Sequence, residues 1–302
     1  MHSDEAFFLT PPKSFCYNGE NSPEVTGMKL TYLGTAAAEG IPCAFCSCDT
    51  CQEARRLGGR NLRTRSQALI DDGLLLDWGA DTYLHTLYGG LDLRRVHTCL
   101  ITHTHCDHLY PEELENRRPD FALLEKEFPL TVCGSAETAA LLRERLGDAF
   151  LDTGRVVVQT VEPFTPFSVQ GYTVIPLPAQ HGTAQPLVYI VQKDDRALLY
   201  AHDTSSFDEP TWEWLSRSGL HFGLVSLDCT AGVVSISYRG HMNFERDAAF
   251  VERLRQAGVI DCRTRLIANH FSHNGHINYD SALEPGVNGG LEISYDGMTV
   301  EF

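Results

Sequence analysis

The 302-residue chain is 43% hydrophobic and 21% charged, a composition typical of a globular protein, and its formal net charge is −16. No apolar run approaches the roughly 20 residues needed to cross a bilayer, which excludes a membrane-spanning protein. The excess of acidic groups repels polyanions at long range, so long nucleic acid is a disfavoured ligand.

The N-terminal residues 1–27 contain three prolines and little hydrophobic periodicity, and we interpret them as an arm or tail. They lack the basic and apolar regions of a secretory signal, so a cytoplasmic location is expected. From Met28 to Phe302 apolar runs recur without a linker or a short-period repeat. Residues 28–302 are therefore predicted to form a single domain.

Nine short apolar runs bounded by turn residues predict β-strands. In chain order they lie at 28–34, 68–79, 96–105, 130–134, 172–182, 196–203, 222–228, 265–270 and 291–302. The turn dipeptides Asp72-Gly73 and Asp296-Gly297 interrupt two of these runs and predict a hairpin at each place.

Helical patterns fill two of the intervals between strands, at 135–147 and 243–258. Asn243 is a good N-cap for the second helix, and Gly258 is a good stop. Strands that alternate with helices predict an α/β fold with strands layered against helices.

Polar side chains recur at or just after the last residue of an apolar run. They are Asp77, His103, His181, Asp203, Asp228 and His270. Ligand sites in α/β proteins collect at the carboxyl ends of strands. These six side chains are therefore predicted to converge on one edge of the fold.

The stretch ITHTHCDHLYPEE contains three histidines and an aspartate within six residues. In an extended backbone His103 and His105 point the same way and can bind one metal ion. Pro111 and the acidic residues after it indicate a helix start, so the chain turns and lets Asp107 and His108 face a second ion. The stretch thus predicts a two-metal site, for which imidazole and carboxylate ligands suit zinc, manganese or iron.

The loop CAFCSCDTC, residues 43–51, holds four cysteines in a chain with no readable secretory signal. The spacing of the last three suits one tetrahedral zinc ion. The fourth ligand is either Cys43, which would complete a local four-thiolate site, or His273, three residues after His270. A set of free buried thiols is the third interpretation.

The pattern His-x-His-x-Asp-His after an apolar strand, with isolated His, Asp and His at later strand ends, resembles the metallo-β-lactamase superfamily from Met28 to Phe302. The resemblance implies an αββα sandwich, two mixed sheets flanked by helices, with a two-metal hydrolytic site. It implies the ligands by position: His103, His105 and His181 for the first ion, Asp107, His108 and His270 for the second, and Asp203 as a bridge. Asp107 is also expected to take part in catalysis, and Asp77 matches an aspartate that orients a ligand histidine.

The cysteine loop resembles that of the PhnP-type cyclic phosphodiesterases, one branch of this superfamily. In that branch a Cys-x-Cys-x-x-Cys loop and a histidine three residues beyond the last active-site histidine hold a structural zinc. The matching residues here are Cys46, Cys48, Cys51 and His273. The resemblance implies that this zinc pins the loop to the segment that carries His270, with Cys43 as a spectator.

His241 resembles in position the histidine that protonates the leaving oxygen in this branch. A surface histidine at a helix start is the alternative, and His202 and His276 are nearby competitors. The segment 115–128 has no clear counterpart. It is expected to form either a lid, with arginines that contact a phosphate, or a solvated charged face.

The resemblance implies a phosphodiesterase with two divalent active-site ions and one structural zinc, which hydrolyses a small, cyclic phosphodiester through a metal-bridging hydroxide. The family also allows a homodimer, which no residue indicates. Other interpretations are a transfer-RNA-processing nuclease of the same fold, a thioester or lactam hydrolase, and a non-catalytic metal-binding accessory protein of a cofactor pathway. The acidic charge disfavours the nuclease, and the complete ligand set favours an enzyme.

Overall fold

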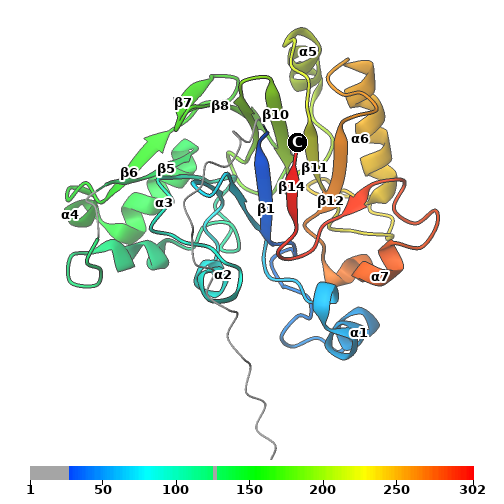
Figure 1. The fold of residues 1–302 in the computed structure, drawn as a ribbon, viewed down its shortest axis with the longest axis horizontal. Helices are drawn as coiled ribbons and strands as arrows, with labels where there is room; N and C mark the ends of the chain where they lie inside the picture. Colours follow the sequence, from blue (N-terminus) through cyan, green and yellow to red (C-terminus); the bar gives the residue numbers. More distant parts are fainter. Residues whose placement is uncertain (1–26, 125–127) are drawn as a thin grey trace, which may run out of the picture.

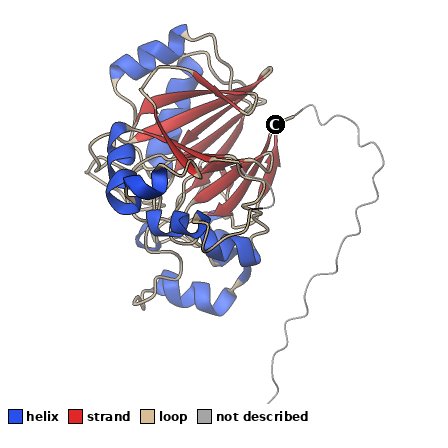
Figure 2. Cartoon of the chain, turned by 90° about the vertical axis from the view of Figure 1, so that its left-hand side faces the viewer, coloured by secondary structure: helices blue, strands red, loops and turns tan. Residues whose placement is uncertain are grey.

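The computed structural model describes residues 27–124 and 128–302, so the predicted N-terminal arm lies outside the described residues except for Gly27. The strands form two seven-stranded sheets that pack face to face, with helices on both outer surfaces (Figure 1 and Figure 2). This layering confirms the predicted αββα sandwich of two mixed sheets.

The first sheet has the strand order β14-β1-β2-β3-β4-β5-β6. Its strands are β1 (Lys29–Gly34), β2 (Gln67–Ile70), β3 (Leu74–Leu76), β4 (Thr98–Leu100), β5 (Leu130–Gly134), β6 (Val156–Thr160) and β14 (Thr299–Glu301). Neighbouring strands are antiparallel from β14 to β3 and parallel from β3 to β6. The parallel part brings the carboxyl ends of β3 and β4 to the same edge.

The second sheet repeats this division in the order β13-β12-β11-β10-β9-β8-β7. Its strands are β7 (Phe167–Val169), β8 (Tyr172–Pro178), β9 (Leu187–Lys193), β10 (Arg196–Ala201), β11 (Leu224–Asp228), β12 (Arg265–Asn269) and β13 (Glu292–Ile293). Strands β7 to β10 are antiparallel, and β10 to β13 are parallel. The ends of β10, β11 and β12 therefore also share one edge.

The helices cover the outer faces. They are α1 (Asp49–Leu57), α2 (Thr82–Tyr88), α3 (Ala136–Leu146), α4 (Asp148–Leu151), α5 (Glu209–Arg217), α6 (Phe244–Gln256) and α7 (Tyr279–Ala282), with 3₁₀ turns at Gly59–Asn61, Pro111–Arg117 and His273–Gly275. Both predicted helices are confirmed as α3 and α6, and Asn243 caps α6 by accepting the Arg246 N–H at 2.9 Å. Over the described ranges, no helix is long and apolar enough to cross a bilayer.

Three apolar layers hold the fold together. Residues of both sheets meet in the central layer, where Tyr32, Tyr189 and Tyr200 are fully buried. Helices α5 and α6 pack on the outer face of the second sheet, and α3 and α4 on that of the first. Because both faces of each sheet are covered, its central strands are nearly continuous apolar runs, which explains why the sequence revealed most of them.

The hairpin predicted at Asp296-Gly297 is wrong. Strand β13 before this turn pairs with β12, whereas β14 after it pairs with β1 in the other sheet. The Asp296 carboxylate accepts hydrogen bonds from the Thr35 hydroxyl and the Thr64 N–H, both at 2.6 Å. These contacts hold the turn where the chain crosses between sheets. The hairpin at Asp72-Gly73 is confirmed by the antiparallel pair β2 and β3.

Candidate metal centre and active site

Three histidines from two segments form the first group of metal-binding side chains. His103 and His105 follow β4, and His181 follows β8. His105 Nδ1 lies 2.9 Å from His103 Nε2 and 3.1 Å from His181 Nε2. The three donor atoms lie within 4.8 Å of one another. Such a group of imidazole nitrogens can hold one divalent cation.

A second, buried group lies beside the first. Its members are Asp107, His108, Asp203 and His270, with donor atoms within 4.8 Å of one another. His108 Nε2 lies 2.6 Å from Asp203 Oδ2 and 3.2 Å from His270 Nε2. Asp203 also approaches the first group, with Oδ2 3.5 Å from His103 Nε2 and Oδ1 3.8 Å from His181 Nε2. This carboxylate therefore faces both groups, as a bridging ligand would.

Burial and the neighbouring carboxylates shift the pKa values of these histidines in different directions. Burial lowers the pKa of His103 and of His181, so both rings are neutral at pH 7, the form that binds a metal. Burial alone would also lower the pKa of His108, but the surrounding carboxylates, Asp107 foremost, raise it. A buried set of imidazoles and carboxylates suits zinc, manganese or iron.

Unusual backbone conformations place several of these groups. Asp77, Asp203 and His270 have φ angles of 69°, 49° and 63°, in the left-handed region that residues other than glycine seldom adopt. Each lies just beyond a strand end. At Gly79, a Cβ atom would lie 1.9 Å from the Asp107 carbonyl oxygen. Only glycine therefore lets this turn approach the loop that carries Asp107 and His108. Backbone strain of this kind concentrates at functional sites.

Hydrogen bonds orient two of the histidine rings. His108 Nδ1 lies 2.7 Å from Asp77 Oδ2, and Asp77 Oδ1 accepts the N–H and the hydroxyl of Thr102 at 2.8 and 2.9 Å. The Gly240 carbonyl accepts a hydrogen bond from His181 Nδ1 at 3.1 Å. These contacts leave Nε2 of each ring free to face the cluster. Asp77 thus contacts the ring of His108 directly.

His241 lies at the rim of the second group, on the loop before α6. Its Nδ1 is 3.1 Å from Asp228 Oδ2 and 3.3 Å from Asp203 Oδ1, and its ring stacks on His270 with centroids 6.0 Å apart. Burial alone would lower its pKa, but Asp228 and then Asp203 outweigh burial and raise it to about 9. The two carboxylates therefore favour the protonated ring, which can donate a proton.

The two competing histidines have other surroundings. His202 is buried beneath the cluster, where its Nε2 lies 2.7 Å from Ser226 Oγ and its ring packs on Tyr200 with centroids 3.9 Å apart. His276 is exposed at the end of the 3₁₀ turn His273–Gly275. Of the three candidates, His241 is the one whose position combines access with a carboxylate partner.

Asp228 connects the segments around His241 through hydrogen bonds, a role that the sequence analysis did not assign. Its carboxylate is fully buried. Oδ1 accepts the N–H groups of Thr230 and Met242 at 3.0 and 2.9 Å, and Oδ2 accepts the Asp203 N–H and the Thr230 hydroxyl, both at 3.0 Å. Asp228 thus links the end of β11 to the bridging aspartate and to the loop of His241. Its place at a strand end was the signal that the sequence offered.

Helix α6 carries another buried carboxyl group, that of Asp247. Asp247 is fully buried, and neither carboxylate oxygen has a nitrogen or oxygen partner among the described residues. Burial raises its pKa well above the usual range, Asp228 adds to the rise, and a contact with the Cys229 thiol opposes it. The folded state favours the neutral acid. The contribution of Asp247 to stability is therefore complete below the pKa near 4 that it has in the unfolded chain, and is lost as the pH rises.

An Asp247→Asn variant is therefore expected to be more stable than the wild type at pH 8, by about 1–3 kcal/mol, with a smaller gain at pH 5. Urea unfolding at both pH values measures this difference. Asp195→Asn, at an exposed aspartate, is the matched control. An equal change in stability at both pH values would contradict the assignment of a neutral Asp247.

Both arginines of the segment 115–128 are held by hydrogen bonds. Arg117 Nη2 donates to the Phe128 carbonyl at 2.7 Å, and Arg118 Nη2 donates to Glu115 Oε1 at 2.9 Å and to the Leu146 carbonyl at 3.4 Å. These hydrogen bonds hold both guanidinium groups within the protein. The suggested phosphate contact therefore finds no support here, and residues 125–127 lie outside the described ranges.

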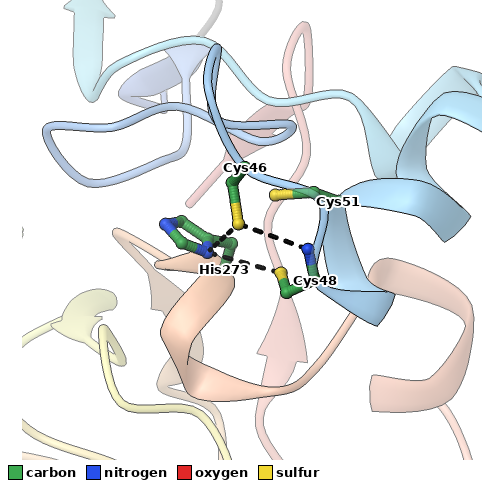
Figure 3. Close-up of side chains that lie close together, drawn as sticks. All are labelled: Cys46, Cys48, Cys51 and His273. Carbon is green, nitrogen blue, oxygen red and sulfur yellow. Dashed lines mark hydrogen bonds between the residues drawn. The ribbon is translucent and has the colours of Figure 1, made fainter.

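The cysteine loop and His273 form a separate group (Figure 3). His273 Nδ1 lies 3.5 Å from the sulfur atoms of Cys46 and Cys48, and Cys51 completes a set of donors within 4.8 Å of one another. Burial opposes ionisation of Cys48, but the N–H of Cys51 and the ring of His273 outweigh it and lower the Cys48 pKa to about 6. Three sulfurs and one imidazole nitrogen suit a tetrahedral zinc ion. Cys43 is not part of this group, and its N–H donates to Cys51 Sγ at 3.3 Å.

Two variants distinguish the candidate fourth ligands. His273→Ala is expected to lose one zinc ion per chain, because it removes the imidazole of this group. Cys43→Ser should keep the metal content of the wild type. Elemental analysis of both purified proteins makes the measurement, and zinc loss in Cys43→Ser alone would transfer the ligand role to Cys43.

Comparisons with known proteins agree with this geometry. Residues 75–271, more than half of the chain, match the family model of the beta-lactamase superfamily domain. A search of curated proteins finds no match.

Several solved structures share the fold. A diphosphatase from the PhnP family is 19% identical, with a TM-score of 0.70 and coverage of 92% of this chain and 98% of its own. Zn²⁺-bound PqqB from Methylobacterium extorquens is also 19% identical, with a TM-score of 0.70 and coverage of 91% and 100%. The short form of human tRNase Z is 16% identical, with a TM-score of 0.60 and coverage of 90% and 98%. At these identities the similarity establishes the fold.

Proposed function

The chain belongs to the beta-lactamase superfamily, and we propose that it is a metal-dependent hydrolase whose substrate is a small, cyclic phosphodiester. The observation that carries this proposal is the position of His241 beside the metal-binding groups, held by the buried Asp228 at 3.1 Å. A diester releases an alkoxide, which is a poor leaving group unless it is protonated. A proton donor at this place serves that bond cleavage.

The donor groups suggest where the ions belong. His103, His105 and His181 would hold one ion, and Asp107, His108 and His270 the other, with Asp203 between them. Two divalent ions, when bound, supply a water of near-neutral pKa and stabilise the charge that develops on phosphorus. Asp77 keeps the ring of His108 directed at the cluster, and His241 transfers its proton to the departing oxygen.

The cysteine group supports the PhnP-type branch within the superfamily. Its proposed structural zinc would join α1 to the segment after β12, which carries His270 three residues before His273. This connection holds a ligand of the second ion in place. Thiolate ligands persist in a reducing compartment, so we place the activity in the cytoplasm.

Hydrolysis of bis(p-nitrophenyl) phosphate by protein of measured metal content tests this proposal. p-Nitrophenyl phosphate, a chromogenic lactam and a transfer-RNA precursor are the comparison substrates. Preferential turnover of the diester, followed by turnover of cyclic phosphates in a wider screen, is the expected result. Preferential cleavage of the lactam or of the RNA would contradict it.

A further inference from the structure

Arg55, in the last turn of α1, contacts the backbone of the cysteine loop from end to end. Its Nη1 donates to the carbonyl oxygens of Cys46 at 2.9 Å and Cys51 at 3.3 Å. Its Nη2 donates to the carbonyl oxygen of Cys43 at 2.9 Å. One guanidinium group therefore hydrogen-bonds to the first and last cysteines of the loop and to Cys46 between them.

The loop backbone also hydrogen-bonds to its own sulfur atoms. The Cys48 N–H donates to Cys46 Sγ at 3.4 Å, and the Cys43 N–H donates to Cys51 Sγ at 3.3 Å. The carbonyls of Cys43 and Cys46 that Arg55 contacts belong to the peptide groups next to these two in the chain. Three thiolates around one divalent ion leave a net negative charge, which a nearby guanidinium offsets.

We propose that Arg55 is a positioning residue for the metal site of Cys46, Cys48, Cys51 and His273, because its guanidinium fixes the loop that brings the thiols together. The inference rests on the proposed structural zinc. A loop already fixed in its metal-binding conformation loses less conformational freedom when the ion binds. Arginine suits this task because its planar fork reaches several acceptors at once.

Cobalt exchange in the full-length protein tests the role. Zn²⁺ is replaced by Co²⁺, and the thiolate-to-cobalt charge-transfer band reports this site alone, since the histidine and aspartate groups contain no thiol. The concentration of chelator that halves the band measures the affinity. Arg55→Ala should lower this affinity by about 10- to 100-fold, as is typical when a residue that supports metal ligands is lost. Arg56→Ala, at the exposed neighbour, should leave it unchanged.

Arg55→Lys keeps the charge without the fork and should also bind cobalt several-fold more weakly. It provides the comparison if Arg55→Ala does not fold. Wild-type affinity in either folded variant would overturn the role of Arg55 and leave the metal site intact. A wild-type protein without the charge-transfer band would instead remove the metal site and, with it, the role of Arg55.

Discussion

An Asp203→Asn variant should lose phosphodiester turnover by about a thousandfold or more, because Asp203 is the carboxylate that faces both metal-binding groups. Its Oδ2 lies 2.6 Å from His108 Nε2, and its Oδ1 lies 3.8 Å from His181 Nε2. Asparagine has nearly the same shape but carries neither the negative charge nor the second acceptor oxygen. It also tolerates the φ of 49° at this position, so the fold should persist.

The measurement combines kcat/KM for bis(p-nitrophenyl) phosphate with the metal content of the same sample. Asp203→Asn should carry fewer active-site ions and keep the zinc of the cysteine group, whose ligands are a separate set. Asp195→Asn, with an exposed side chain, should retain full activity. An Asp203→Asn enzyme within tenfold of the wild type would show that this carboxylate does not join the two ions.

The predicted site depended on a general property of the fold. His103, Asp203 and His270 each follow an apolar run, and parallel strands bring such positions to one edge. Both sheets contain a parallel part, β3 to β6 and β10 to β13. The two edges meet, so residues far apart in the chain approach within hydrogen-bonding distance. This convergence could be expected from strand ends alone.

Contacts that depend on tertiary structure could not be predicted in the same way. Asp228 was recognised as a polar group at a strand end, but its hydrogen bonds come from three separate segments. Asp247 follows the polar pattern of a helix start and is nevertheless fully buried. From the sequence alone, Arg55 is an ordinary charged residue of a helix. A side chain of each type is usually solvated, and only the packing of neighbouring segments reveals its partners.

Three strands, β6, β7 and β9, were not predicted from the sequence, and tertiary contacts explain two of them. Strand β9 is a buried apolar run, LVYIVQK, so its own residues fit a strand, and it pairs antiparallel with β8 and β10 on its two sides. Strand β7 is short and pairs with β8, and β6 ends in polar residues after its apolar start. Strand propensity depends on such neighbours more than on the residues themselves. Local pattern therefore fits the central strands, β9 included, whereas β6 and β7 depend on their neighbours.

His241→Ala is expected to slow diesters with alkyl leaving groups by about 10²- to 10⁴-fold, and activated aryl diesters by less than about tenfold. An alkoxide must be protonated as it departs, whereas p-nitrophenolate is stable without a proton. His241 can supply that proton because Asp228 holds its Nδ1 at 3.1 Å and favours the charged ring. A residue needed only for folding or metal binding would instead reduce the two rates equally.

The plot of log kcat/KM against leaving-group pKa separates these cases, since loss of a general acid steepens its slope. Metal content and thermal stability of His241→Ala should match those of the wild type. His276→Asn is the matched control, because asparagine tolerates the φ of 53° at this exposed histidine. A steeper slope in His276→Asn, with an unchanged slope in His241→Ala, would move the proton-donor role to His276. His241 also lies within 4.8 Å of the donor atoms of Asp203, Asp228 and His270, so wild-type metal content in both variants is what assigns a difference in slope to the transfer of the proton.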